Sequence, residues 1–209
     1  MSADGGHDSP RRATRDLSAL LGSRICHDLI SPLGAIGNGV ELLSMSGISG
    51  APEIALIAES VESANARIRF FRIAFGAASI GQAIPQSEVL DILGAMNRGG
   101  RLTIHWKVEG PLERVRVKLA FLLLQCLETA MPFGGEITIS GSETGWFVLG
   151  KADRLKIDPD IWALLLVEPN VETDVSPAHV QFALVSDAAA RAGRTLSTTF
   201  GEAEIRIGC

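Results

Sequence analysis

Cysteine is scarce in this chain, and long apolar runs and any surplus of basic residues are missing. The 209 residues include three cysteines, at positions 26, 126 and 209. This odd, widely spaced set offers neither a disulfide framework nor a CxxC metal site, so Cys26 and Cys126 are expected to be small buried side chains. The longest apolar stretch, Leu119 to Cys126, is too short to cross a bilayer.

The charge balance points away from nucleic acid and anionic membranes. Lys and Arg number 19 against 24 Asp and Glu, which gives a net charge of -5, so the chain has no general attraction to polyanions. The N-terminal residues MSADGGHDSPRRATRD lack the apolar core of a secretory signal. The sequence therefore predicts a cytoplasmic protein that meets its partners through specific surfaces, with no nucleic acid and no membrane among them.

A long helix is predicted after a polar N-terminal tail. Residues 1–13 are polar and without periodicity, so they are expected to be disordered. From Thr14 onward, apolar residues recur every three or four positions, as on one face of a helix of roughly eight turns. These residues are Leu17, Leu21, Ile25, Leu29, Leu33, Ile36, Val40 and Leu43. The turn SMSGISGAP follows, and Pro52 suits the first position of a second helix.

The second helix has the spacing of coiled-coil packing. Its apolar stripe consists of Ile54, Ile57, Val61, Ala64, Ile68, Phe71 and Phe75. Two helices joined by a short loop form an antiparallel hairpin, and a lone hairpin leaves side chains such as Phe70 and Phe71 in water. Pairing with a second copy into a four-helix bundle would bury them. The alternative is that the rest of the same chain covers them.

A second domain is predicted beyond a break at residues 76–86, where Gly76, Gly81 and Pro85 interrupt the periodicity. We divide the chain into a hairpin at 14–80, a linker at 81–86 and an α/β sandwich at 87–209, which makes the fold class α+β. Helices are expected near 86–97, 112–130, 159–167 and 177–192. Strands are expected at 102–108, 136–140 and 146–149 and around 196–200 and 203–207.

The residues best suited to chemistry surround His27 in the first helix. At about 100° per residue, His27 lies on the side opposite the apolar stripe and points into water. Ser23, Ser31, Gly34 and Asn38 share its face. All four are small, so another protein can bring its backbone close to the imidazole.

His27 and Asp28 form a candidate nucleophile and its acid–base partner. A neutral imidazole is a good nucleophile at physiological pH. The Asp28 carboxylate can accept a hydrogen bond from Nδ1–H, which leaves the Nε2 lone pair free to attack phosphorus. Pro32 cannot donate to the carbonyl of Asp28, which predicts a bend one turn later. Since a solvent-facing histidine on a helix often has no chemical role, these residues alone leave both interpretations open.

The segment HDLISPLGAI at 27–36 resembles the H-box of sensor histidine kinases. More narrowly, RICHDLISPLGAIGNGVELL at 24–43 is similar to the ChpT family of histidine phosphotransferases. The resemblance implies a homodimer built on a four-helix bundle, followed by a domain shaped like a histidine kinase ATPase domain. It also implies that His27 accepts phosphate from the receiver domain of a hybrid histidine kinase and passes it to response regulator receiver domains. Any Mg²⁺ would belong to the receiver, and this chain is expected to bind no cofactor and no metal.

The second domain departs from a kinase at each nucleotide-binding motif. A kinase would carry Asn at the places of Gln125 and Thr129, and the second Asn would bind Mg²⁺ beside the triphosphate. Where a kinase has its Asp-x-Gly-x-Gly turn, residues 150–154 read GKADR, so only Asp153 remains. Residues 179–184, HVQFAL, replace the Gly-x-Gly-Leu turn that lets backbone amides reach phosphate. The resemblance therefore implies a domain that has kept the kinase fold and lost the ability to bind ATP.

An arginine run on the second helix has two interpretations. Arg67, Arg69 and Arg72 are typical of a solvated helix face, but folding the hairpin back about Ile48 places residue 69 level with His27. Arg67 and Arg69 would then lie within range of an incoming phosphoryl group or an acidic partner. We therefore predict a docking surface made of Ser23, Ser31, Gly34, Asn38, Arg67 and Arg69.

The remaining candidates are interpreted as structural. His105 and His179 have no second metal-ligand type nearby, and Trp146, Phe147 and Trp162 lack the basic cluster of a base-stacking surface. We assign the two histidines to structural or surface positions and the three aromatic residues to the core. Two other functions stay open, a dimeric scaffold that only binds receivers and an ATP-using histidine kinase.

Overall fold

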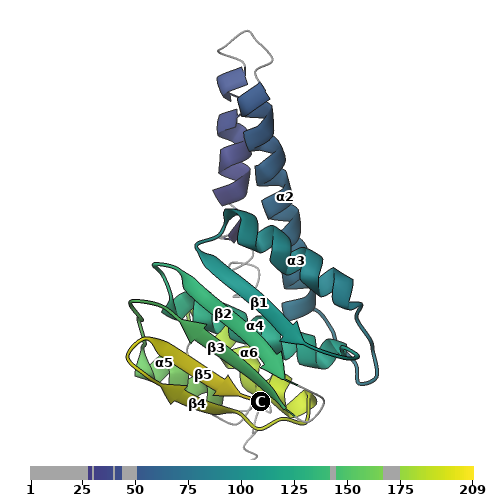
Figure 1. Ribbon diagram of the computed structural model, residues 1–209, viewed down its shortest axis with the longest axis vertical. Helices are drawn as coiled ribbons and strands as arrows, with labels where there is room; N and C mark the ends of the chain where they lie inside the picture. Colours follow the sequence, from purple (N-terminus) through teal and green to yellow (C-terminus); the bar gives the residue numbers. More distant parts are fainter. Residues whose placement is uncertain (1–27, 30, 40, 44–50, 142–144, 167–174) are drawn as a thin grey trace, which may run out of the picture.

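A helical hairpin stands on an α/β domain (Figure 1). The computed structural model describes residues 28–29, 31–39, 41–43, 51–141, 145–166 and 175–209. The predictions for the tail at 1–13 and for Ser23, Cys26 and His27 lie outside these residues. Where the first hairpin helix is described, at 28–29, 31–39 and 41–43, it is helical.

The second hairpin helix, α2, spans Ala51–Ala74. It lies close against the first helix at Gly39, because a Cβ there would come within 2.6 Å of Ile57 Cγ1. Glu53 lies in its first turn and Arg72 in its last, and both charges suit the helix dipole. The three-and-four spacing thus folds as predicted.

Five strands form one mixed sheet in the order β1-β2-β3-β5-β4. β1 and β2 are parallel and are connected through α4, whereas the other neighbouring pairs are antiparallel. A parallel pair needs such a crossover, and a helix is its usual form. The strands are β1 Leu102–Val108, β2 Gly135–Gly141, β3 Trp146–Lys151, β4 Ser197–Phe200 and β5 Glu204–Gly208.

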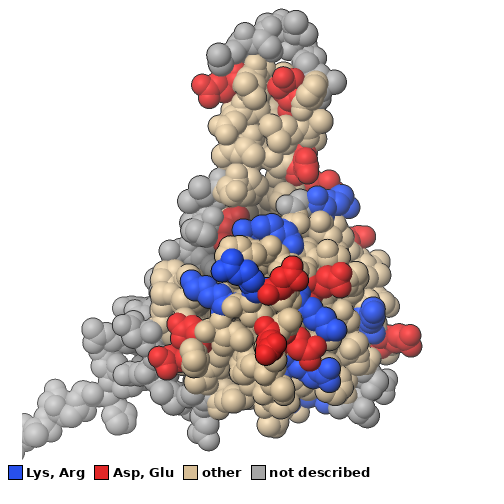
Figure 2. All heavy atoms as spheres, turned by 60° about the vertical axis from the view of Figure 1, so that its left-hand side comes forward, with Lys and Arg blue, Asp and Glu red and all other residues tan. Residues whose placement is uncertain are grey.

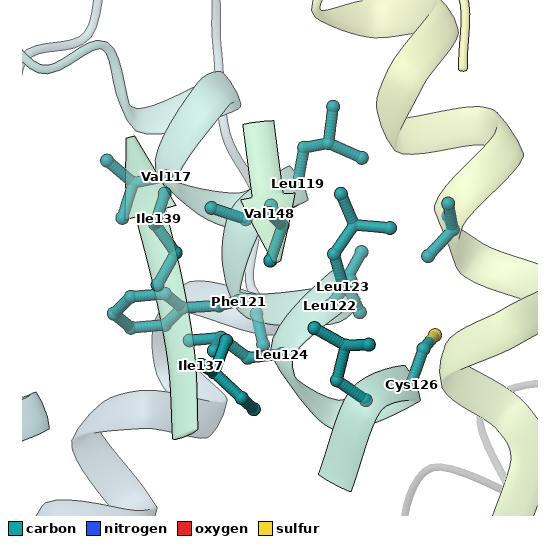
Figure 3. Packing of buried hydrophobic residues seen from close by; sticks show 14 of the residues in the cluster. Val117, Leu119, Phe121, Leu122, Leu123, Leu124, Cys126, Ile137, Ile139 and Val148 are labelled. Carbon is teal, nitrogen blue, oxygen red and sulfur yellow. The ribbon is translucent and has the colours of Figure 1, made fainter. Parts of the chain in front are cut away.

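The helices of the second domain gather on one face of this sheet (Figure 1). α4 is buried along most of its length and forms the centre of the core, where it meets β2, β3 and α6 (Figure 3). Asp158 caps α5, because its carboxylate accepts hydrogen bonds from the N–H groups of Asp160 and Ile161. The helical segments are α3 Gln86–Gly99, α4 Arg114–Ala130, α5 Pro159–Ala163, η1 Leu164–Leu166, η2 Pro177–His179 and α6 Val180–Arg191.

The second domain covers one end of the hairpin's apolar stripe. Phe70 is fully buried and stacks on Phe121 of α4 with ring centroids 4.4 Å apart, and Phe71 is buried beside it. Of the two alternatives for these phenylalanines, the structure shows cover by the same chain, since α2 packs on both α3 and α4 here. Fully burying such a side chain contributes about 1.5–3 kcal/mol.

Two aromatic side chains of the second domain are core residues as predicted, and one is not. Trp146 and Trp162 are buried, but Phe147 is 53% exposed. Successive side chains of a strand point to opposite faces of the sheet. Because Trp146 and Val148 of β3 face the helices, Phe147 faces solvent. Cys126 is buried as expected.

Candidate functional site

A cavity of about 310 Å³ lies where the hairpin meets the second domain. Asp28 and Ser31 line it from the first helix, Ser63 and Arg67 from α2, and Arg101 and Glu128 from the second domain. Apolar side chains such as Phe70 and Ile137 line the rest. The cavity therefore brings Asp28, the residue that follows the predicted nucleophile, to the domain junction.

Arg67 is held by a carboxylate that the sequence analysis missed. Its guanidinium donates two hydrogen bonds to Glu128, Nη2 to Oε1 at 2.9 Å and Nη1 to Oε2 at 3.3 Å. Burial by itself lowers the pKa of Arg67, but the charge and hydrogen bonds of Glu128, with a smaller effect of the Asp28 charge, raise it overall. Arg67 therefore already has a carboxylate partner, and its predicted role toward a phosphoryl group or an acidic partner stays a prediction.

The other predicted docking residues that the structure describes lie on the hairpin surface. Ser31, Gly34 and Asn38 are exposed, and no heavy atom lies within 4 Å of a Cβ added at Gly34. Arg69 is half-buried, and no ion pair is found for it within the described part of the chain. The structure brings Asp28, Ser31 and Arg67 together around the cavity, but Gly34, Asn38 and Arg69 do not line it.

The residues that the sequence analysis compared with kinase nucleotide motifs contact one another where α4 meets α6. Gln181 Nε2 donates to Thr129 Oγ1 at 3.0 Å and to the Ala178 carbonyl at 3.0 Å. Thr129 in turn donates to the carbonyl of Gln125 at 3.0 Å. The side-chain amide of Gln125 is fully buried, and neither of its polar atoms has a hydrogen-bond partner among the described residues. A polar residue inside the apolar run of α6 was the signal that could have singled out Gln181.

The segment that replaces the Asp-x-Gly-x-Gly turn lies at an open groove. Asp153 is exposed there, and the guanidinium of Arg154 lies over the ring of Phe133 at 4.9 Å. Within the described ranges, no group of three or more His, Cys, Asp and Glu side chains could hold a metal ion. The search of those same residues found no helix that is long and apolar enough to cross a membrane.

No strong rival nucleophile emerges from the described histidines and cysteines. His179 shares a hydrogen bond at 3.0 Å with Ser176 at the start of α6, and His105 lies half-buried in β1. Burial raises the pKa of the Cys209 thiol to about 11, so little thiolate is present at neutral pH. The two histidines fit the structural or surface positions expected from the sequence.

Comparison with known proteins identifies the class. The family model described as the histidine phosphotransferase C-terminal domain matches residues 86–204. The chain belongs to the ChpT-type histidine phosphotransferases, and it is a phosphotransferase enzyme.

Two relatives illustrate how far this similarity extends. The protein phosphotransferase ChpT of Brucella abortus (strain 2308) is 40% identical over 152 residues, which are 69% of this chain and 71% of the relative. A solved structure of a bacterial phosphotransferase superposes with a TM-score of 0.74 at 32% identity, and it covers 92% of this chain and 95% of the other. The α+β fold expected from the sequence is thereby confirmed.

Proposed function

We propose that this chain carries a phosphoryl group on His27 between receiver domains of a phosphorelay. It accepts the group from the receiver of a hybrid histidine kinase and passes it to receivers of response regulators, which implies a cytoplasmic location. The observation that carries the proposal is the position of Asp28. This carboxylate lines the junction cavity beside an exposed face of small residues, within a chain that belongs to the histidine phosphotransferases.

The chemistry needs only a nucleophile and a base from this chain. The Nε2 lone pair of His27 attacks the phosphorus of the receiver's aspartyl phosphate. The N–P bond forms as the P–O bond breaks, and the receiver's carboxylate leaves with the bonding electron pair. Asp28 accepts a hydrogen bond from Nδ1–H and stabilises the positive ring that results. A Mg²⁺ ion in the receiver neutralises charge on the transferring group.

The proposal includes a homodimer through a four-helix bundle. Ile54, Val61 and Ile68 of α2 are between 42% and 50% exposed in the single chain, and Leu33 of the first helix is exposed as well. Figure 2 supports this assignment, because the projecting part of the hairpin carries few charged side chains on the face it shows, whereas acids and bases alternate over the domain. Exposed apolar side chains clustered in this way favour a protein partner.

In this proposal the second domain does not bind ATP. The contacts of Gln181 with Thr129 join α6 to α4 across the position of the kinase motifs. Titration of the purified chain with Mg-ATP should therefore release no measurable heat. Micromolar binding would favour the ATP-using kinase instead.

The test of the nucleophile uses the full chain and receiver domains from the same genome. Each receiver is phosphorylated with acetyl phosphate, freed of reagent and mixed with the chain. Transfer should produce an acid-labile label that is missing in His27→Gln. Asp28→Asn should slow transfer by about 10²- to 10⁴-fold. Label that persists in His27→Gln moves the nucleophile elsewhere, and binding without any transfer favours the scaffold.

A further inference from the structure

We infer that Glu128, a residue of the second domain, is a positioning residue for phosphotransfer. It holds the Arg67 guanidinium away from Asp28, so that the Asp28 carboxylate can accept the hydrogen bond from His27. The inference rests on the proposed function, because it presumes that His27 and Asp28 carry the reaction. It adds a task for the second domain, which would act on the reacting residues through the Arg67–Glu128 pair.

The geometry of the pair is that of a fixed clamp. Two nitrogens of Arg67 meet the two oxygens of Glu128, at 2.9 and 3.3 Å. A planar guanidinium bound at two points keeps one orientation, which a single ion contact does not impose. The two side chains are 26% and 31% exposed, so water competes only partly for these bonds.

The backbone beneath Glu128 belongs to the most deeply buried helix of the domain. Leu127 and Leu124 of α4 are buried in the core, and the Phe70–Phe121 stack joins the same two helices. The stack lies about one turn beyond Arg67 on α2 and about two turns before Glu128 on α4. The distance between the Arg67 and Glu128 backbones is therefore set by core packing. Glu128 thus accepts hydrogen bonds from a fixed position and restrains the long, otherwise flexible side chain of Arg67.

The junction cavity offers Arg67 one other carboxylate among its lining residues. Asp28, Arg67 and Glu128 all line this space, and the charge of Asp28 already acts on Arg67. A guanidinium released by Glu128 would turn to Asp28 and pair with it. That pairing would take up the carboxylate that His27 needs for its Nδ1–H.

The chain supplies a matched control on the same helix, in the last turn of α2 beyond Arg67. Arg72 of α2 pairs with Glu88 of α3 at 2.9 Å, so this contact also joins the hairpin to the second domain. Arg72 is mostly exposed, and neither residue lines the junction cavity. Glu88→Gln therefore removes an equivalent interdomain charge pair without touching the predicted site.

The experiment measures single-turnover transfer from an acetyl-phosphate-charged receiver domain to the full chain over a range of receiver concentrations. Glu128→Gln should lower the maximal rate by about 10- to 100-fold, as for a misplaced reacting group, with the half-saturating concentration unchanged. Glu128→Asp, which keeps the charge, should recover part of the rate. The double variant Glu128→Gln with Arg67→Gln should recover most of it, because no guanidinium remains to occupy Asp28.

The possible outcomes separate this role from a structural one. If Glu88→Gln and Glu128→Gln slow transfer equally, both ion pairs only hold the hairpin against the second domain, and the inference is overturned. A double variant as slow as Glu128→Gln, or a Glu128→Gln variant at the wild-type rate, would overturn it too. Label retained in His27→Gln would instead show that the proposed function itself fails. Melting temperatures of all variants identify any that no longer fold.

Discussion

The hairpin and the second domain differ in how much of their surface each leaves for other molecules. The hairpin exposes apolar residues such as Ile54 and Ile68, and a polar face with Ser31 and Gly34. The second domain covers one face of its sheet with helices and joins α4 to α6 through the contact of Gln181 with Thr129. The comparison teaches that exposed apolar and small side chains concentrate on the projecting element, which is where the proposed partners would bind, whereas the larger domain buries most of its apolar residues in its own core.

The junction between the two regions should respond most strongly to mutation. Phe70→Ala removes a fully buried ring that stacks on Phe121. We expect the free energy of unfolding to fall by about 3–5 kcal/mol, measured by urea denaturation. Phe147→Ala, at a ring that is 53% exposed, is the control and should cost far less. Similar losses for both variants would mean that the junction is no more tightly packed than the surface.

The hairpin's apolar surface gives the second prediction. Ile68→Asp places a charge in the proposed dimer seam, where an unpaired ion costs several kcal/mol. Sedimentation should find the wild type as a dimer at micromolar concentration and the variant as a monomer or misfolded. Ile80→Asp, at a side chain that is 83% exposed and lies beyond the end of α2 at Ala74, should stay dimeric. A wild-type monomer at that concentration contradicts the dimer.

The interior of the second domain offers a substitution that should increase stability rather than lower it. Gln125 buries an amide without hydrogen bonds among the described residues, so the unbranched apolar substitution Gln125→Met should raise stability by about 1–3 kcal/mol. Gln181→Met is the control, because its amide donates two hydrogen bonds, and stability should fall. Thermal denaturation compares them. A loss of stability in Gln125→Met would indicate that this amide has a partner of its own.

The smallest expected effect concerns recognition at the hairpin surface. Arg69→Glu should slow encounter with an acidic receiver by about 3- to 10-fold at low salt, and the difference should shrink as ionic strength rises. Arg191→Glu on α6 makes the same change in net charge away from the hairpin. Stopped-flow association at two salt concentrations distinguishes them. Equal effects of both substitutions would indicate a response to net charge rather than a docking surface.

Elements with a strong local period could be predicted from the sequence, and the chemistry proposed for the first helix also depends on the sequence alone. β1 spans the expected residues 102–108, and α4 ends at Ala130 as predicted. Side chains that alternate along a strand or recur along a helix carry their own signal, because burial follows the period of the element. The succession His27-Asp28 with Pro32 likewise resembles a known motif without any tertiary information.

Contacts between distant parts of the chain were decided only by the tertiary structure. Arg67 and Glu128 are 61 positions apart, and no local pattern indicates that the two side chains meet. Phe70 and Phe71 are a second example. The helical period indicates that they are buried, but it does not indicate whether the second domain or a second copy covers them. The amino-acid sequence determined which faces had to be buried, and the packing of α2 on α3 and α4 decided what covers these phenylalanines. The reason is that the hydrophobic effect is not directional, so an apolar stripe requires burial without specifying which element buries it.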